Sequence, residues 1–174
     1  QYAETLKNVA VLYISEGRYD IAFNALTVAE NIWRVKTGTK NNINAAGIYT
    51  LTGDVYYQLK NYGKAEEFYN KSKDLYEKFF SVNHPEYVKA LSKLSKVYYM
   101  QKDFKRAKRL IEQSLANYEQ FIKNYFPALS EREKAKYWNT IKSDFEFYNT
   151  LAFSNMEDFR DLTGKVYNAQ LMTK

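Results

Sequence analysis

Residues 55–69 read VYYQLKNYGKAEEFY, and closely similar stretches occur twice more in the chain. Residues 12–26 read LYISEGRYDIAFNAL, and residues 97–111 read VYYMQKDFKRAKRLI. Each copy holds the end of an apolar helix, a polar turn, an aromatic residue and the start of a second helix. The second residue of each copy is a tyrosine, and these tyrosines are 43 and 42 residues apart. A fixed spacing of this size predicts a row of stacked helical hairpins.

Small residues recur at the same places in all three copies. An alanine stands nine residues after each aligned tyrosine, and the next apolar position is four residues further on. A second small residue follows three residues later. The three series are Ala22, Ala65 and Ala107, then Leu26, Tyr69 and Ile111, then Ala29, Ser72 and Ser114. Small side chains let two helix backbones approach closely, so these positions are expected in the core.

The turn signals place the helices of an all-α fold. We expect three hairpins within residues 1–126, at about 2–36, 43–80 and 85–125. Gly38 is the expected stop of the first hairpin, and Asn83-His84-Pro85-Glu86 is the expected helix start of the third. Residues 127–174 are expected to form capping helices and a connection to a further domain. Ser130-Glu131-Arg132-Glu133 reads as a capping box that opens a helix to about 153, and a last helix is expected over 158–174.

The three hairpins resemble the tetratricopeptide repeat, and this resemblance extends to residue 126. The family's small residue in the first helix is matched by Ala10, Gly53 and Ser95, whereas its tryptophan and its closing proline are absent. The longer period is similar to the 42-residue variant of kinesin-light-chain-like arrays. The resemblance implies a right-handed superhelix of hairpins that serves as a non-catalytic scaffold for protein–protein interaction.

First helices line a concave groove in this family. When the family's groove positions are transferred to this chain by aligning the tyrosines, the resemblance implies a mildly basic, partner-binding groove. Its residues are Lys7, Val11, Ile14, Thr50, Asp54, Tyr57, Lys89, Ser92, Lys96 and Tyr99. Such a groove suits an acidic or extended peptide. The alternative is that the groove is empty or covered by another domain of the same protein.

The tail carries a second resemblance. Residues 126–133 read FPALSERE, and Tyr137-Trp138 and Phe145 follow. This segment looks like the one that links tetratricopeptide arrays to a CHAT domain, a caspase-like cysteine peptidase fold, in bacterial proteins. It implies an alternative function, the regulation of a peptidase domain beyond Lys174, which would be the partner of the array.

Composition excludes most catalytic and metal sites. The chain has 174 residues, no cysteine and one histidine, His84, which we expect to be a loop or helix-cap residue. No zinc-thiolate site, cysteine nucleophile or glycine-rich phosphate loop is present, so no enzyme activity, catalytic residue, metal or cofactor is expected. The longest apolar run, Val9 to Ile14, is too short to span a membrane.

The net charge of +6 is concentrated in residues 86–123, which hold nine basic and four acidic residues. A basic face attracts anionic surfaces, but no aromatic–basic recognition motif accompanies it, so nucleic-acid binding is the less favoured alternative. We expect a cytoplasmic protein. Because the start at Gln1 reads as a cut through an array, we expect the open apolar face of the first repeat to be covered by another molecule, as in a homodimer.

Overall fold

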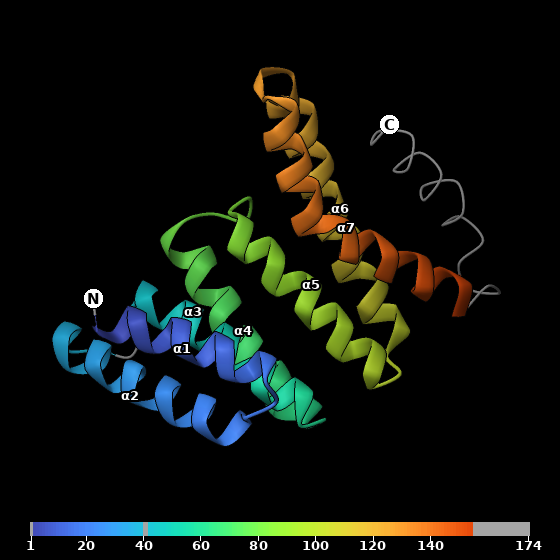
Figure 1. The fold of residues 1–174 in the computed structure, drawn as a ribbon. Coiled ribbons are helices and arrows are strands. Elements are labelled where there is room, and N and C mark those ends of the chain that lie inside the picture. The colour runs from blue at the N-terminus through green and yellow to red at the C-terminus, as the bar shows by residue number, and fades with distance from the viewer. Residues whose placement is uncertain (1, 40–41, 155–174) are drawn as a thin grey trace. The chain divides into compact units, whose positions relative to one another are not determined.

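The computed structural model describes residues 2–39 and 42–154, and every regular element among them is a helix (Figure 1). The elements, in chain order, are α1 (Tyr2–Ser15), α2 (Tyr19–Thr37), α3 (Ile43–Gln58), α4 (Tyr62–Phe79), α5 (Pro85–Met100), α6 (Phe104–Tyr125), the 3₁₀ helix η1 (Phe126–Ala128) and α7 (Glu131–Ser154). The expected all-α fold class is confirmed, and the helix pairs α1–α2, α3–α4 and α5–α6 span 2–37, 43–79 and 85–125, within one residue of the expected hairpin limits. The last expected helix, 158–174, lies outside the described residues.

The contacts divide the chain into two compact units, residues 1–97 and residues 98–174. In the first unit α1 packs against α2, α3 packs against α4, and both α1 and α2 contact α3 (Figure 1). In the second unit α7 packs against α6, and η1 makes the turn between them. The boundary between the units falls inside α5. The separation of repeats from capping helices at residue 126, drawn from the sequence, stays a prediction.

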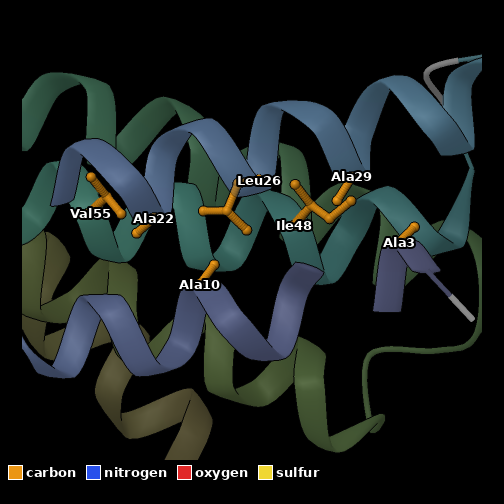
Figure 2. Packing of buried hydrophobic residues seen from close by; sticks show 7 residues of the cluster. All are labelled: Ala3, Ala10, Ala22, Leu26, Ala29, Ile48 and Val55. Carbon is orange, nitrogen blue, oxygen red and sulfur yellow. The ribbon is translucent and has the colours of Figure 1, made fainter. Parts of the chain in front are cut away.

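The core of the first unit lies where α1, α2 and α3 meet. Ala10 of α1, Leu26 of α2 and Ile48 and Val55 of α3 point into one cluster (Figure 2). The recurring alanines of the second helices are all fully buried: Ala22, Ala65 and Ala107 each expose 0% of their surface. The prediction that these three alanines lie in the core is therefore confirmed. A larger side chain at any of them has no space to fill.

The turn inside each hairpin has the same backbone geometry. Gly17, Lys60 and Lys102 adopt left-handed conformations, with φ of 74°, 59° and 63°. In each case the next residue donates its N–H to the carbonyl of the aligned tyrosine, at 2.8 to 2.9 Å. This bond satisfies a carbonyl at the end of the first helix, and the left-handed residue is the usual way to end a helix. Side-chain caps on the second helix follow at Asn61 and Asp103.

Replacing Lys60 with glycine is expected to stabilise the protein by about 1 kcal/mol. Glycine adopts positive φ without the steric cost that a lysine Cβ adds. The matched control is Gln113→Gly, in the exposed middle of α6, which should destabilise by about 1 kcal/mol because glycine is a poor helix former. Urea denaturation of both variants measures the two free energies, and a loss of stability in Lys60→Gly would contradict the turn geometry.

Gly53 and Tyr69 form a complementary pair between α3 and α4. A Cβ built on Gly53 would lie 2.5 Å from two ring carbons of Tyr69. The corresponding residues of the first hairpin are Ala10 and Leu26, which are both in the core cluster. In the second hairpin the larger side chain of the second helix, Tyr69, thus packs against the smaller residue of the first helix, Gly53. Tyr69 also donates its hydroxyl to Asp54 Oδ1 at 2.6 Å, which fixes the ring in this place.

Gly53→Ala is expected to destabilise the protein by about 2 kcal/mol, because the clash with Tyr69 exceeds the gain in helix propensity. Gly63→Ala is the control, since no atom lies within 4 Å of a Cβ at that helical glycine; it should be neutral or slightly stabilising. Combining Gly53→Ala with Tyr69→Leu recreates the pair of the first hairpin and should recover part of the lost stability in urea denaturation. A full loss in the double variant would argue against the clash as the cause.

An apolar stripe on α7 holds the second unit together. Ile141 and Tyr148 are buried, and the Phe145 ring lies 5.2 Å from Trp138 and 6.4 Å from Tyr118 of α6. Tyr118 donates its hydroxyl to the buried Asp144 carboxylate at 2.9 Å. The apolar stripe of α7 therefore packs on α6, the second helix of the third predicted hairpin.

The predicted capping box at the start of α7 is also present. The Ser130 N–H and hydroxyl both donate to the Glu133 carboxylate, and the Glu133 N–H donates back to Ser130 Oγ. These bonds hold the pKa of Glu133 below its usual value, because the side-chain and backbone donors of Ser130 favour the ionised carboxylate. The box satisfies donors that the first turn of the helix leaves open.

Candidate functional site

The ten predicted groove residues lie on first helices, and nine of them fall in the first unit. Seven of these nine are at least partly accessible, and we refer to them as the first-helix face. Its members are Lys7, Val11 and Ile14 of α1, Asp54 and Tyr57 of α3, and Lys89 and Lys96 of α5. Tyr99, the tenth residue, belongs to the second unit and is described with that unit.

Thr50 and Ser92 are not accessible, although they were expected to line the groove. They expose 6% and 2% of their surface. The Thr50 hydroxyl instead lies 2.7 Å from the hydroxyl of Ser72 on α4, in a buried hydrogen bond. Both residues share the repeat position of Lys7. Lysine is long enough to extend its ammonium group beyond the helix packing at this position, whereas the short side chains of threonine and serine stay inside it.

Most lysines near the first-helix face are paired with carboxylates. Lys7 Nζ lies 2.7 Å from Glu4, and Lys89 Nζ lies 3.6 Å from Glu86. Lys7 also borders Gly47 of α3, since a Cβ there would lie 3.3 Å from its ammonium nitrogen. The mildly basic character expected from the sequence is therefore largely balanced by neighbouring carboxylates on the same helices. Exposed pairs of this kind are weak and open readily to another charged group.

Lys93 is a residue of this region that the sequence did not single out. It forms an ion pair with Asp54, so α3 and α5 are joined by a charged contact. Asp54 accepts from Tyr69 as well, and the Lys93 ammonium group lies 5.6 Å from the centre of the Tyr69 ring. The corresponding residues in the other hairpins are Asn8 and Leu51, so no repeat pattern could have indicated Lys93.

Two pairs of adjacent tyrosines, Tyr56-Tyr57 and Tyr98-Tyr99, end first helices. The second tyrosine of each pair packs against the aromatic residue that follows the turn of its hairpin. Tyr57 packs edge-on against Tyr62, with ring centres 5.6 Å apart, and in the second unit Tyr99 packs against Phe104 at 5.7 Å. Burial, and then the nearby Tyr62 hydroxyl, raise the pKa of Tyr57. Tyr57 therefore keeps a neutral hydroxyl at physiological pH, which can donate to or accept from a ligand.

The basic stretch 86–123 is divided between the two units. Several of its cations already have partners: Lys89 with Glu86, Lys93 with Asp54, and Arg106 with Asp103. The Arg106 guanidinium also lies 4.2 Å from the centre of the Tyr98 ring. The charges of this stretch therefore support local packing of the helices.

His84 has the expected role at a helix start. Its Nδ1 accepts from the Glu86 N–H at 3.3 Å, and its ring stacks on Phe80 at 4.2 Å between centres. Within residues 2–39 and 42–154, no group of three or more histidine or acidic residues is placed to hold a metal ion. In the same part of the chain, no helix combines the length and the apolar character that crossing a bilayer requires.

Comparison with known proteins relates this geometry to a repeat family. Residues 44–120 match the tetratricopeptide repeat family. The search among curated proteins gives no match.

Solved structures share the fold at low sequence identity. BtubC (BKLC) from P. vanneervenii is 20% identical, with a TM-score of 0.76, and the alignment covers 98% of this chain and 62% of BtubC. The chain thus spans less than two thirds of the length of BtubC. A putative kinesin light chain of Podosopora anserina with nearly identical TPR-like repeats, and a substituted form of that protein, are each 13% identical, with TM-scores of 0.60 and 0.59. Those alignments cover 97% of this chain and 90% of theirs.

The family match and the structural neighbours agree with the recurring turns and the equivalent buried alanines. Residues 44–120 are thus similar to tetratricopeptide repeats, and they lie within an all-α fold shared with TPR-like helical repeat proteins.

Proposed function

We propose that the first-helix face binds an extended segment of a partner protein. Tetratricopeptide repeats mediate protein–protein interaction, and the match over residues 44–120 carries this proposal. The first helices α1, α3 and α5 contribute accessible cationic, apolar and aromatic side chains to the face. The chain itself acts as a non-catalytic scaffold.

The chemistry of the face favours a peptide with acidic and apolar residues. A ligand carboxylate can replace Glu4 or Glu86 beside Lys7 or Lys89, because these exposed ion pairs are worth little by themselves. Val11, which is 49% exposed, and the half-buried Ile14 and Tyr57 offer contacts for apolar side chains. Such aromatic and apolar anchors usually contribute most of the affinity of a peptide interface.

Charge reversal tests the electrostatic part of this proposal. Lys7→Glu combined with Lys89→Glu is expected to weaken binding of acidic peptides from a synthetic array by about tenfold or more, because attraction becomes repulsion. The matched control is Lys71→Glu, at a lysine of the second helix α4 that also has a carboxylate partner, Glu67. Equal affinities for the two variants, measured by fluorescence anisotropy, would place the binding surface elsewhere.

The aromatic contact is tested separately. Tyr57→Ala should weaken peptide binding, whereas Tyr57→Phe should retain most of the affinity if the ring is the main contact. Thermal melting of both variants separates a loss of binding from a loss of folding. Because Tyr57 also packs on Tyr62, a result is informative only at temperatures where each variant is folded.

The resemblances in the sequence support the finer parts of the proposal. The spacing of 43 and 42 residues is the basis for assigning the hairpins to the extended, kinesin-light-chain-like repeat variant. The segment from Phe126 supports a regulatory link to a CHAT-type peptidase domain in a bacterial, cytoplasmic protein. Sequence beyond Lys174 that holds a paired histidine and cysteine would support this link, and a different downstream domain would remove it.

A further inference from the structure

The solvent-exposed side of α2, which we call its outward side, carries no charged residue over two turns. Residues 21–29 read IAFNALTVA, and they contain no acidic or basic residue. Val28 and Val35 expose 45% and 79% of their surface, and Asn24 and Asn31 are also exposed. Charged residues normally dominate the exposed side of a helix in solution, whereas interface cores are depleted of them.

The repeats provide an internal comparison for this side. The corresponding helix α4 bears a charged residue at each of five matching positions, namely Lys64, Glu67, Lys71, Asp74 and Lys78. Helix α6 has Arg106, Arg109, Gln113, Ala116 and Gln120 at the same positions. In α2 they are Ile21, Asn24, Val28, Asn31 and Val35. The hairpin fold accepts polar residues there, so it does not itself require the branched aliphatic residues of α2.

The aliphatic residues of α2 are spaced for helix–helix packing. Ile21, Val28 and Val35 are seven residues apart, with Ala25 and Ile32 between them. This alternation of four and three residues is the spacing at which one helix packs lengthwise against another. Ala25 and Ile32 pack against the core cluster formed by α1, α2 and α3, while Val28 and Val35 remain exposed beside them.

The charges at the two ends of α2 favour a second copy of the same helix as the partner. Asp20 lies in the first turn, and Arg34 and Lys36 lie in the last turn. If two copies pack antiparallel about Val28, Ile21 faces Val35 of the second copy, and Asp20 faces its Lys36. The twofold symmetry makes each of these contacts twice. Parallel packing would instead bring like charges together.

We propose that α2 is a homodimer interface, in which two copies pack antiparallel with Val28 at the twofold axis. This gives a specific site to the homodimer expected from the sequence. It does not depend on the proposed function, because peptide binding uses first helices whereas this contact uses a second helix. The interface is small, so its dissociation constant is expected in the micromolar range.

Sedimentation equilibrium of the whole chain between about 10 µM and 1 mM tests the proposal. Val28→Lys combined with Val35→Lys gives α2 the residues that α4 carries, and it should raise the dissociation constant at least tenfold. The matched control is Gln113→Lys with Gln120→Lys, at the same repeat positions of α6, which should leave the dimer intact. Circular dichroism checks that both variants are folded. A monomer at every concentration, or a dimer unaffected by the α2 variant, would overturn the proposal.

Charge reversal tests the antiparallel direction. Asp20→Lys should raise the dissociation constant severalfold, and adding Lys36→Asp in the same chain should restore it, because the opposite charges again face each other. Since the chain lacks cysteine, Val28→Cys alone should form a covalent dimer on oxidation, whereas Val35→Cys alone should not. Efficient self-crosslinking of Val35→Cys would indicate a parallel pair and contradict the proposal.

Discussion

Replacing Ala107 with arginine is expected to reduce the free energy of unfolding by about 3 kcal/mol or more. Ala107 exposes 0% of its surface on α6. Arginine at this position must either push its neighbours apart or leave a guanidinium group buried without a partner, and both are costly. Ala65→Arg on α4 should behave in the same way, because Ala65 is buried to the same degree.

The control for this substitution is Ala116→Arg in the same helix. Ala116 is exposed, so the same change of side chain should alter stability by no more than about 0.5 kcal/mol. Lys105 is also exposed on α6, so Lys105→Glu should change the free energy of unfolding by equally little. Urea denaturation followed by circular dichroism gives the three free energies. A near-normal transition for Ala107→Arg would mean that the repeat alignment is wrong.

Stability is expected to fall steeply between about pH 10 and pH 12. Burial, and then the negative charge of Glu30, raise the pKa of Tyr49 to about 12. Burial, followed by Glu86 and Glu4, also raises the pKa of Tyr76 to about 12. Burial and the adjacent Asp54 carboxylate raise the pKa of Tyr69 well above its usual value. All three side chains expose less than a tenth of their surface.

The direction of the effect follows from the raised pKa values. An unfolded tyrosine loses its proton near pH 10, whereas these folded tyrosines keep theirs. Their contribution is therefore fully present below about pH 10 and is lost as the pH rises toward 12 and above. Each tyrosine contributes at most about 1.4 kcal/mol per pH unit, so the three together contribute up to about 4 kcal/mol per unit.

Tyrosine-to-phenylalanine variants isolate this effect from the titration of lysines. Tyr49→Phe should reduce the slope of stability against pH by about a third of the contribution of Tyr49, Tyr69 and Tyr76, since one of these three titrating groups is removed. Tyr2→Phe, at a tyrosine that is 66% exposed, should leave the slope unchanged. Urea denaturation at several pH values between 9 and 12 measures the slopes. A Tyr49→Phe slope identical to that of the unchanged protein would exclude this tyrosine as a cause.

Local signals in the sequence account for the accuracy of the helix assignments. Gly38 ends α2 in the left-handed conformation, Asn42 caps α3 by accepting from the Ala45 N–H, and Ser130 opens the capping box of α7. Each device operates within four residues of the chain. It therefore needs no knowledge of distant contacts, and a single sequence is sufficient to identify it.

The candidate site was predicted less completely, because accessibility depends on side-chain length as well as on repeat position. Thr50, Ser92 and Lys7 share one position, yet only the lysine is long enough to extend out of the packing. The ion pair between Asp54 and Lys93 joins residues 39 apart in the chain. No spacing rule of a helical repeat connects those two residues.

The sequence by itself determined where the helices begin and end and which alanines are buried, because both follow from local hydrogen bonding and from the repeated spacing of small and apolar residues. Only the tertiary structure decided that Gly53 accommodates the Tyr69 ring, that Asp54 pairs with Lys93 and that the outward side of α2 remains open. These features depend on the distances between helices and on the volumes of facing side chains, which arise only when the helices pack together.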